Sequence, residues 1–223
     1  SKKIFDREAL LGVSVTGWMN NPEVLFDAKD LEKGAKIVKK INREVAAIIG
    51  INPAARTTCV KPSGNASVLL QTASGIHAEH SPMYIRNIQM NKESEITQSI
   101  IKSNPYMVEE SVWSANGTDV VISYPIVPHK GSMYKDDLIG VKHLELVKKA
   151  QKHWVIAGTN EELCADEGIR HNVSNTIIVD DWDEVEKYVF ENRYSFSGIS
   201  FLSMSGDKDY NQAPNTAVID EKQ

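Results

Sequence analysis

Residues Thr57–Ser67 read TTCVKPSGNAS, a β-branched run followed directly by small and turn-forming residues. The run Thr57–Val60 favours a β-strand, and the Pro, Ser, Gly and Asn residues behind it favour a turn. Small residues let a ligand approach the backbone, whose N–H groups can hold an anion together with nearby hydroxyl groups. We therefore predict a strand that ends in an anion-binding loop, although an ordinary strand-to-helix turn would explain the same residues.

The composition is that of a globular protein. Of the 223 residues, 41% are hydrophobic and 25% are charged, and the formal net charge is −5. A negative net charge argues against a general nucleic-acid binder, because such proteins depend on contacts with phosphates. No apolar run approaches the roughly 20 residues that span a membrane, and no signal peptide follows Ser1, so we expect a cytoplasmic protein without membrane partners. The two cysteines fit a reducing compartment, and no His/Cys spacing predicts a metal site.

Strands and helices are expected to alternate along the chain. We predict strands at 10–17, 57–60, 84–90, 119–127, 172–179 and 198–204, the first and the last of them buried, and helices at 30–49, 94–102, 137–155 and 181–194. Residues 66–70 fit either a short helix or an extended segment. Pro125 should lie at a strand edge or end, Asp181 should cap a helix, and Trp154 should pack in the core. The pattern indicates an α/β fold with mostly parallel strands and one region, 1–223, without a domain boundary.

Four short blocks follow one another along nearly the whole chain. They are Val60–Ser67 (VKPSGNAS), Ser74–His77 (SGIH) with Tyr84–Arg86 (YIR) behind it, His153-Trp154 with His171–Thr176 (HNVSNT), and Gly198–Leu202 (GISFL) with Tyr210–Pro214 (YNQAP). In this order and spacing they resemble the adenosylcobalamin-dependent, class II ribonucleotide reductases. The first block resembles the family's substrate-phosphate loop, which more often carries Gly-Thr where this chain has Gly64-Asn65.

The resemblance implies both a fold and a reaction. The fold is the C-terminal half of a ten-stranded α/β barrel, and the reaction is the radical reduction of ribonucleotides to deoxyribonucleotides for DNA precursor synthesis. In class II enzymes the cofactor adenosylcobalamin generates a thiyl radical on a cysteine. The implied partners are a ribonucleoside di- or triphosphate, the upstream half of the barrel and a thioredoxin-type reductant.

The family's radical cysteine lies in a motif, Asn-Pro-Cys-x-Glu, that this sequence lacks, and no cysteine follows Cys164. We therefore expect no catalytic residue in this chain, and we expect the chain alone to be inactive. Because it begins at Ser1 with a short charged lead, we expect a piece of a longer polypeptide. Cys59 is expected to be buried and structural. Residues 200–204 lack the tyrosine pair that carries the radical in class I enzymes, which favours class II.

The resemblance also assigns site residues. Substrate phosphates would be bound by Pro62, Ser63, Gly64, Asn65, Ala66 and Ser67. A wall facing substrate or cofactor would be formed by Lys61, His77, Arg86, Asn172, Ser174 and Asn175. Polar residues at strand ends in α/β barrels often face the active site, which supports the last three. Structural roles remain open for the others: solvent exposure for Lys61, a local hydrogen bond for His77 and an ion pair for Arg86. The acidic loop 161–167 is expected to be a solvated surface.

Two other functions fit the sequence. The first is a non-catalytic phosphate-binding α/β module, and the second is a fragment of a class I large subunit. The two interpretations are distinguished by observations outside this sequence. The first would be favoured by a flanking sequence without the radical-cysteine motif, and the second by a small-subunit partner.

Overall fold

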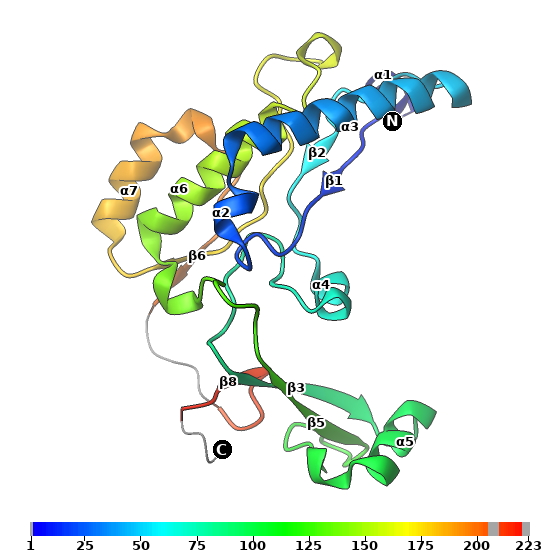
Figure 1. Cartoon of the computed structure of the whole chain (residues 1–223), viewed down its shortest axis with the longest axis vertical. Coiled ribbons are helices and arrows are strands. Elements are labelled where there is room, and N and C mark those ends of the chain that lie inside the picture. The colour runs from blue at the N-terminus through cyan, green and yellow to red at the C-terminus, as the bar shows by residue number, and fades with distance from the viewer. Residues whose placement is uncertain (1, 205–209, 220–223) are drawn as a thin grey trace. The chain divides into compact units, whose positions relative to one another are not determined.

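A computed structural model describes residues 2–204 and 210–219 (Figure 1). The chain divides into two compact units, each described by itself: unit 1 is Ser1–Ala78 with Lys130–Ser205, and unit 2 is Glu79–His129 with Gly206–Gln223. That residues 1–223 belong to a single catalytic barrel domain stays a prediction. No described helix has both the length and the apolar character needed to cross a membrane.

Unit 1 alternates helices with short strands. Its main elements are α1 (Lys2–Glu8), β1 (Val13–Ser14), α2 (Pro22–Leu25), α3 (Ala28–Ile49), β2 (Thr58–Cys59), α4 (Gly64–Leu70), α6 (Gly140–Ala150), β6 (Ile177–Val179), α7 (Trp182–Glu191) and β7 (Phe201–Ser203). Helix α6 continues into a π-helical segment, η3 (Gln151–Ile156), and short 3-10 turns are η2 (Lys135–Asp137), η4 (Glu161–Leu163) and η5 (Arg193–Ser195).

The helix ends in unit 1 follow the sequence signals. The Asp27 side chain accepts a hydrogen bond from the Asp30 N–H at the start of α3, and Gly50 ends that helix with a φ of 73°. Asp181 caps α7 as predicted, because its side chain accepts hydrogen bonds from the N–H groups of Asp183 and Glu184. Such caps satisfy backbone groups that a helix end would otherwise leave unpaired.

Strands in unit 1 pair in parallel. Strand β1 pairs with β2, and β6 pairs with β7. A parallel bridge between Val60 and Val173 links the end of β2 to the segment that leads into β6. Parallel neighbours separated by helices are the arrangement that the sequence predicts for this part of the chain.

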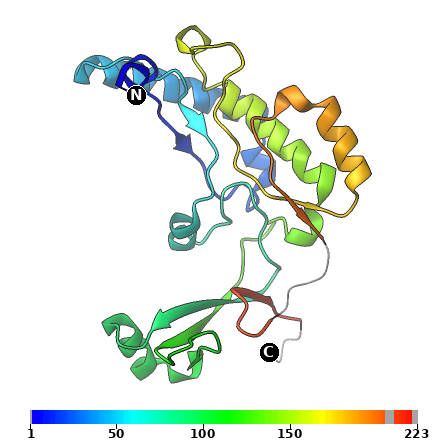
Figure 2. The same cartoon turned by 180° about the vertical axis from the view of Figure 1, so that it is seen from behind.

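Unit 2 differs from the prediction. Its sheet has the order β4-β5-β3-β8 and is antiparallel throughout (Figure 2). The elements are β3 (Tyr84–Asn91), α5 (Glu95–Ser103), η1 (Pro105–Met107), β4 (Val108–Glu110), β5 (Asp119–Ile126) and β8 (Asn215–Ala217). A mixed α/β fold is confirmed, but the expectation of mostly parallel strands is wrong. Strand β3 is only partly buried along its length, which is typical of an antiparallel sheet with one solvated face.

Pro125 occupies the part of β5 that extends beyond β4. Strand β4 pairs with Val120–Ile122 only, so among the described strands Pro125 faces a partner on one side, Ile85 of β3. A proline cannot donate a backbone hydrogen bond, so it is tolerated where one side of the strand is unpaired. The predicted edge position is confirmed.

The core of unit 1 lies between its helices and parallel strands. Trp18, Ile76, Leu144, Val173 and Ile177 are fully buried there. Trp154 is 5% exposed, and its indole N–H donates a 3.0 Å hydrogen bond to the Cys59 carbonyl oxygen. The predicted core position of Trp154 and the predicted burial of Cys59 are both confirmed.

Two strands expected to be buried are exposed instead. All described residues of β1 and β7 are exposed, and within the described chain each strand pairs along one edge only. Helix α3 also has exposed apolar side chains: Leu31 and Ala35 near its start are buried, whereas Ile48 near its end is 82% exposed. The sequence gives these residues an apolar character, but the described chain supplies no element that covers them.

Candidate functional site

The predicted anion-binding loop joins strand β2 to helix α4. Residues 66–70, for which the sequence left two conformations open, belong to this helix, which begins at Gly64. Ser63 occupies the N-cap position, but its side chain does not cap the helix. The N–H groups of the first helical turn, Gly64–Ala66, have no acceptor within the helix itself, so they are suited to an anion.

Thr16 holds the loop from the neighbouring segment. Its hydroxyl oxygen accepts hydrogen bonds from the Ser63 hydroxyl at 2.5 Å and from the Gly75 N–H at 2.9 Å, and its own hydroxyl donates to the Ala73 carbonyl oxygen at 3.0 Å. Sequence reasoning missed Thr16, because it treated residues 10–17 only as an apolar strand. The signal was the alternation of Ser14 and Thr16 within that strand, which places both hydroxyl groups on one side.

A second loop approaches the first closely at Gly75. A Cβ atom at this position would lie 2.7 Å from the Lys61 carbonyl oxygen, and Gly75 has a φ of 55°. Both observations require glycine here. On the other side, the Lys61 N–H donates a 2.9 Å hydrogen bond to the Ser14 hydroxyl oxygen. The blocks VKPSGNAS and SGIH, separate in sequence, therefore form one structural element.

The loop residues differ in their exposure to solvent. Lys61, Pro62, Gly64, Asn65 and Ala66 are exposed. No atom outside the helix backbone and the neighbouring residues lies within 4 Å of a Cβ built on Gly64, so the space beside this residue is open. Ser63 is partly buried, and Ser67 is buried, with its hydroxyl donating to the Gly64 carbonyl oxygen. Ser67 thus supports the helix from inside, whereas the residues from Lys61 to Ala66 offer the accessible groups.

His77 makes the structural hydrogen bond that the sequence left open. Its Nδ1 lies 3.0 Å from the Ser74 carbonyl oxygen. Its ring also meets the buried His143 edge-on, with 6.3 Å between ring centroids. Burial lowers the pKa of His143 from 6.5 to about 4, so this ring is neutral at neutral pH.

The segment before β6 lies beside the loop-bearing strand. The Val60 N–H donates to the Asn172 carbonyl oxygen at 3.2 Å, and the Ser174 N–H donates to the Val60 carbonyl oxygen at 2.9 Å. Asn172 and Ser174 are therefore bonded through their backbones to Val60, the residue that follows β2. The Asn172 side chain is exposed and the Ser174 side chain is half-buried.

Asn175 is buried and links the segments that lead into β6 and β7. Its amide Nδ2 donates to the carbonyl oxygens of Val173 at 2.7 Å and Gly198 at 3.2 Å. Its buried Oδ1 has no hydrogen-bond partner within the described structure. These contacts give the Asn175 side chain a structural role.

Arg86 belongs to unit 2, on strand β3. Its guanidinium donates a 2.9 Å hydrogen bond to the Tyr84 hydroxyl, which in turn donates to Glu79 at 3.1 Å. Burial, together with the nearby Glu79 carboxylate, raises the pKa of Tyr84 to about 12. The structure thus gives Arg86 a structural contact of its own within unit 2.

Neither cysteine has the environment of a reactive thiol. Burial raises the pKa of Cys59 and of Cys164, so both thiols stay protonated at neutral pH. Both are free cysteines. Over the described residues, no group of three or more His, Cys, Asp or Glu side chains is placed to hold a metal ion. The acidic residues Glu161, Glu162, Asp166 and Glu167 are exposed, as predicted for a solvated loop.

Comparison with known proteins gives consistent relatives. No protein-family model matches the chain. A probable adenosylcobalamin-dependent ribonucleoside-triphosphate reductase of Dictyostelium discoideum is 26% identical over 219 residues, which cover 96% of this chain and 27% of that protein. The adenosylcobalamin-dependent ribonucleoside-triphosphate reductase of Euglena gracilis is 26% identical over 229 residues, covering 100% of this chain and 29% of the relative.

The fold agrees with these relatives. A crystal structure of a B12-dependent, class II ribonucleotide reductase matches with a TM-score of 0.81 and 18% identity, over 100% of this chain and 33% of that one. The chain thus spans about a quarter to a third of the proteins that it matches. The resemblance predicted from the four blocks is confirmed: the chain is similar, in sequence and in fold, to part of the adenosylcobalamin-dependent, class II ribonucleotide reductases.

Proposed function

We propose that this chain is the part of an adenosylcobalamin-dependent ribonucleotide reductase that holds the phosphate groups of the substrate. The observation that carries the proposal is the match of nearly the whole chain to curated reductases. The loop 62–67 supports it, because helix α4 begins within this loop and the Ser63 side chain does not cap it. Both curated relatives act on ribonucleoside triphosphates according to their names, so we propose a triphosphate as the substrate.

The phosphate group would meet the first turn of α4. The N–H groups of Gly64, Asn65 and Ala66 would donate hydrogen bonds to its oxygens, and the exposed Lys61 would add positive charge. The Ser63 hydroxyl is directed to Thr16, so Ser63 would act mainly through its backbone. This arrangement binds and orients the phosphate end of a nucleotide and leaves the chemistry at the ribose to other residues.

Adenosylcobalamin belongs, in this proposal, to the complete enzyme, where it would supply the radical. Three of the expected wall residues already make hydrogen bonds within this chain. The Asn175 amide donates a hydrogen bond to the backbone, His77 is hydrogen-bonded to the Ser74 carbonyl oxygen, and Arg86 donates to the Tyr84 hydroxyl. We therefore assign no step through the cofactor to this chain. Burial raises the pKa of both cysteines of this chain, so in this proposal the reducing cysteines and their thioredoxin-type reductant belong to the rest of the enzyme.

The remaining barrel strands are proposed as the partner of unit 1. An apolar groove of about 480 Å³, the α3 groove, is lined mainly by residues of α3 and of the segment around β1, including Phe5, Leu10, Val13, Ile41, Val45 and Ile49. Large exposed apolar surfaces of this kind mark interaction sites. The chain spans under a third of its curated relatives, so the upstream half of the reductase is the occupant that we propose. Strands β1 and β7, each with one free edge among the described strands, would then continue into a ten-stranded barrel.

The proposal is tested by comparing the chain alone with the complete reductase, assembled from purified parts. We expect the complete enzyme to act in the cytoplasm. The chain alone, supplied with adenosylcobalamin, a dithiol and a ribonucleoside triphosphate, should form no deoxyribonucleotide. The same chain joined to the upstream half should form it. A complete protein that folds and binds nucleotide without turnover would instead favour a non-catalytic phosphate-binding module.

A further inference from the structure

Unit 2 contains a pocket that the proposed function does not use. It has a volume of about 480 Å³ and lies on one face of the antiparallel sheet. Its lining comes from three separate segments: Asn87 and Gln89 of β3 with Val121 of β5, Trp113 of the loop after β4, and Tyr210, Gln212 and Pro214 near the C-terminal end. Gln89 and Val121 are opposite each other in the sheet register, so they form the floor together.

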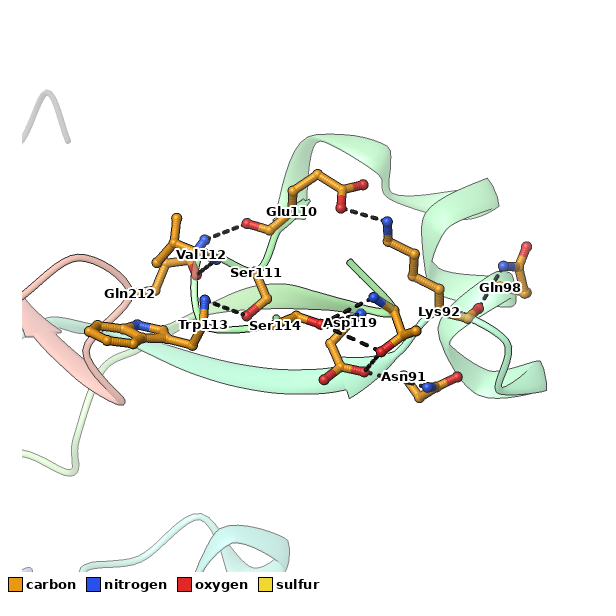
Figure 3. A network of polar contacts seen from close by, with 11 residues as sticks. Asn91, Lys92, Gln98, Glu110, Ser111, Val112, Trp113, Ser114, Asp119 and Gln212 are labelled. Atoms are coloured by element: carbon orange, nitrogen blue, oxygen red, sulfur yellow. Dashed lines mark hydrogen bonds and ion pairs between the residues drawn. The ribbon is translucent and has the colours of Figure 1, made fainter. Parts of the chain in front are cut away.

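The wall of the pocket is fixed by hydrogen bonds between two loops. The Trp113 indole N–H donates to the Asn211 carbonyl oxygen at 3.0 Å. The Gln212 side chain donates to the Glu110 carbonyl oxygen at 2.7 Å and accepts from the Val112 N–H at 2.8 Å (Figure 3). Because Gln212 bonds at both ends of its amide, the loop that carries Trp113 is held against the C-terminal segment before any ligand arrives.

Asn87 ties the same C-terminal segment to the sheet. Its side-chain amide donates to the Ala213 carbonyl oxygen at 2.7 Å, and its N–H donates to the Pro214 carbonyl oxygen at 2.9 Å. Its Oδ1 accepts from the Ser123 hydroxyl at 2.9 Å. Asn87 is therefore a structural residue. The exposed Gln89 donates a 2.8 Å hydrogen bond from its Nε2 to the Asp119 carboxylate, which orients the amide and leaves its Oε1 to accept from a ligand.

The lining has the chemistry of an aromatic-ring site. Trp113 is 60% exposed and Tyr210 is 49% exposed, and their rings meet edge-on with 5.6 Å between centroids. Such an arrangement leaves a face of the indole open to stack with another ring. None of the seven residues that line the pocket carries a charged side chain, so the lining offers no cation for a phosphate group.

We propose that this pocket binds an uncharged planar heteroaromatic ring of the nucleobase kind, stacked on Trp113 with its polar edge toward Gln89. The volume lies within the range of small-molecule sites and leaves room for a nucleoside. Aromatic side chains favour such rings, and the Gln89 Oε1 can accept a hydrogen bond from a donor on the edge of such a ring. The site uses none of the residues assigned to substrate phosphate. Its ring can come from a free nucleoside or from a nucleobase carried on a larger cofactor.

Equilibrium dialysis of the full chain, with labelled adenosine and separately with adenosylcobalamin, tests the proposal. Wild-type protein should bind at least one probe saturably. Trp113→Ala should weaken that binding by at least about tenfold, as expected for the loss of a stacking partner. Trp182→Ala, which removes another half-exposed tryptophan outside this pocket, should leave binding unchanged. If Trp113→Ala fails to fold by circular dichroism, Gln89→Ala serves as the second variant, because Gln89 is exposed.

The outcomes separate the sources of the ring. Binding of adenosine through Trp113 identifies a free nucleoside site, and binding of adenosylcobalamin alone through Trp113 identifies a ring carried by the cofactor; both support the proposal. Absence of saturable binding by either probe at millimolar concentration overturns it. So does binding that is equally strong in the folded Trp113→Ala and Gln89→Ala variants. Each of these results is independent of whether loop 62–67 holds substrate phosphate.

Discussion

The hydroxyl of Ser63 donates a 2.5 Å hydrogen bond to the hydroxyl oxygen of Thr16, although the two residues are 47 positions apart. At the N-cap of α4, a serine hydroxyl would ordinarily accept a hydrogen bond from the helix. Here the Ser63 side chain makes no hydrogen bond to the helix, so the first-turn N–H groups are left for a ligand. Thr16 therefore positions the loop without being one of its exposed residues.

Thr16→Val should impair nucleotide binding more than overall stability. The variant keeps the shape of the side chain but removes the bonds to Ser63, Gly75 and Ala73. In the complete reductase we expect KM for the ribonucleotide to rise by about tenfold, because the loss of these three hydrogen bonds frees the loop from Thr16. Steady-state kinetics measure this, and Thr16→Ser, which retains the hydroxyl, should restore KM. Equal KM values for wild type and Thr16→Val would show that Thr16 does not position the loop.

Gly75→Ala should destabilise unit 1 by at least about 2 kcal/mol, because it combines backbone strain with overlap. The added methyl group would lie 2.7 Å from the Lys61 carbonyl oxygen. Gly50→Ala is a matched control: Gly50 also has a positive φ, but a Cβ there has no neighbour within 4 Å. It should cost about 1 kcal/mol. Urea unfolding curves compare the two variants, and equal losses would contradict the close approach of the two loops.

Cys59→Ser should leave turnover of the complete enzyme within about twofold of wild type, since a buried thiol of raised pKa is a poor nucleophile. The buried hydroxyl should lower the melting temperature instead. Cys59→Ala tests the same point without introducing a polar group. If both variants fold and both abolish turnover, the structural role assigned to Cys59 is wrong.

Acid should destabilise the chain partly through His143. Its folded-state pKa of about 4 lies below the unfolded value of 6.5, so the unfolded state binds the proton first. Stability is therefore unaffected by this group above pH 6.5 and falls as the pH drops from 6.5 to 4, by up to about 3 kcal/mol. The free energy of unfolding, measured against pH, should fall less steeply in His143→Gln. Parallel curves for the two proteins would contradict the assignment.

Much of the fold follows from local sequence. Helix α3 was predicted at 30–49 from its apolar spacing and Gly50 and spans 28–49, because Asp27 caps it earlier. Helix α7 was predicted at 181–194 from Asp181 and spans 182–191, so its start was predictable and its end was not. The antiparallel sheet of unit 2 was not, because the pairing of β3 with β5 depends on contacts across the sheet and not on either strand alone. Burial of β1 and β7 was overestimated for a related reason: an apolar strand is buried only where another element covers it.

The candidate site was predictable in outline. The loop residues 62–67 were chosen as the candidate site from their small side chains and from the family resemblance, and their role stays a prediction. Thr16 required the structure, because its contacts join distant segments. Asn175 and Arg86 illustrate the reverse case. Their residue types suit a binding wall, yet Asn175 bonds to neighbouring backbone and Arg86 bonds to Tyr84. Residue type alone cannot distinguish a ligand contact from a structural hydrogen bond.

The measurement that tests the central claim most directly is KM of the complete reductase carrying Asn65→Asp. Asn65 is exposed in the first turn of α4, so the substitution places a negative charge beside the proposed phosphate position. We expect KM for the ribonucleoside triphosphate to rise by about tenfold while kcat changes little, and Asn65→Ala, which adds no charge, to have a smaller effect. An unchanged KM in a folded Asn65→Asp enzyme would contradict the assignment of loop 62–67 to substrate phosphate.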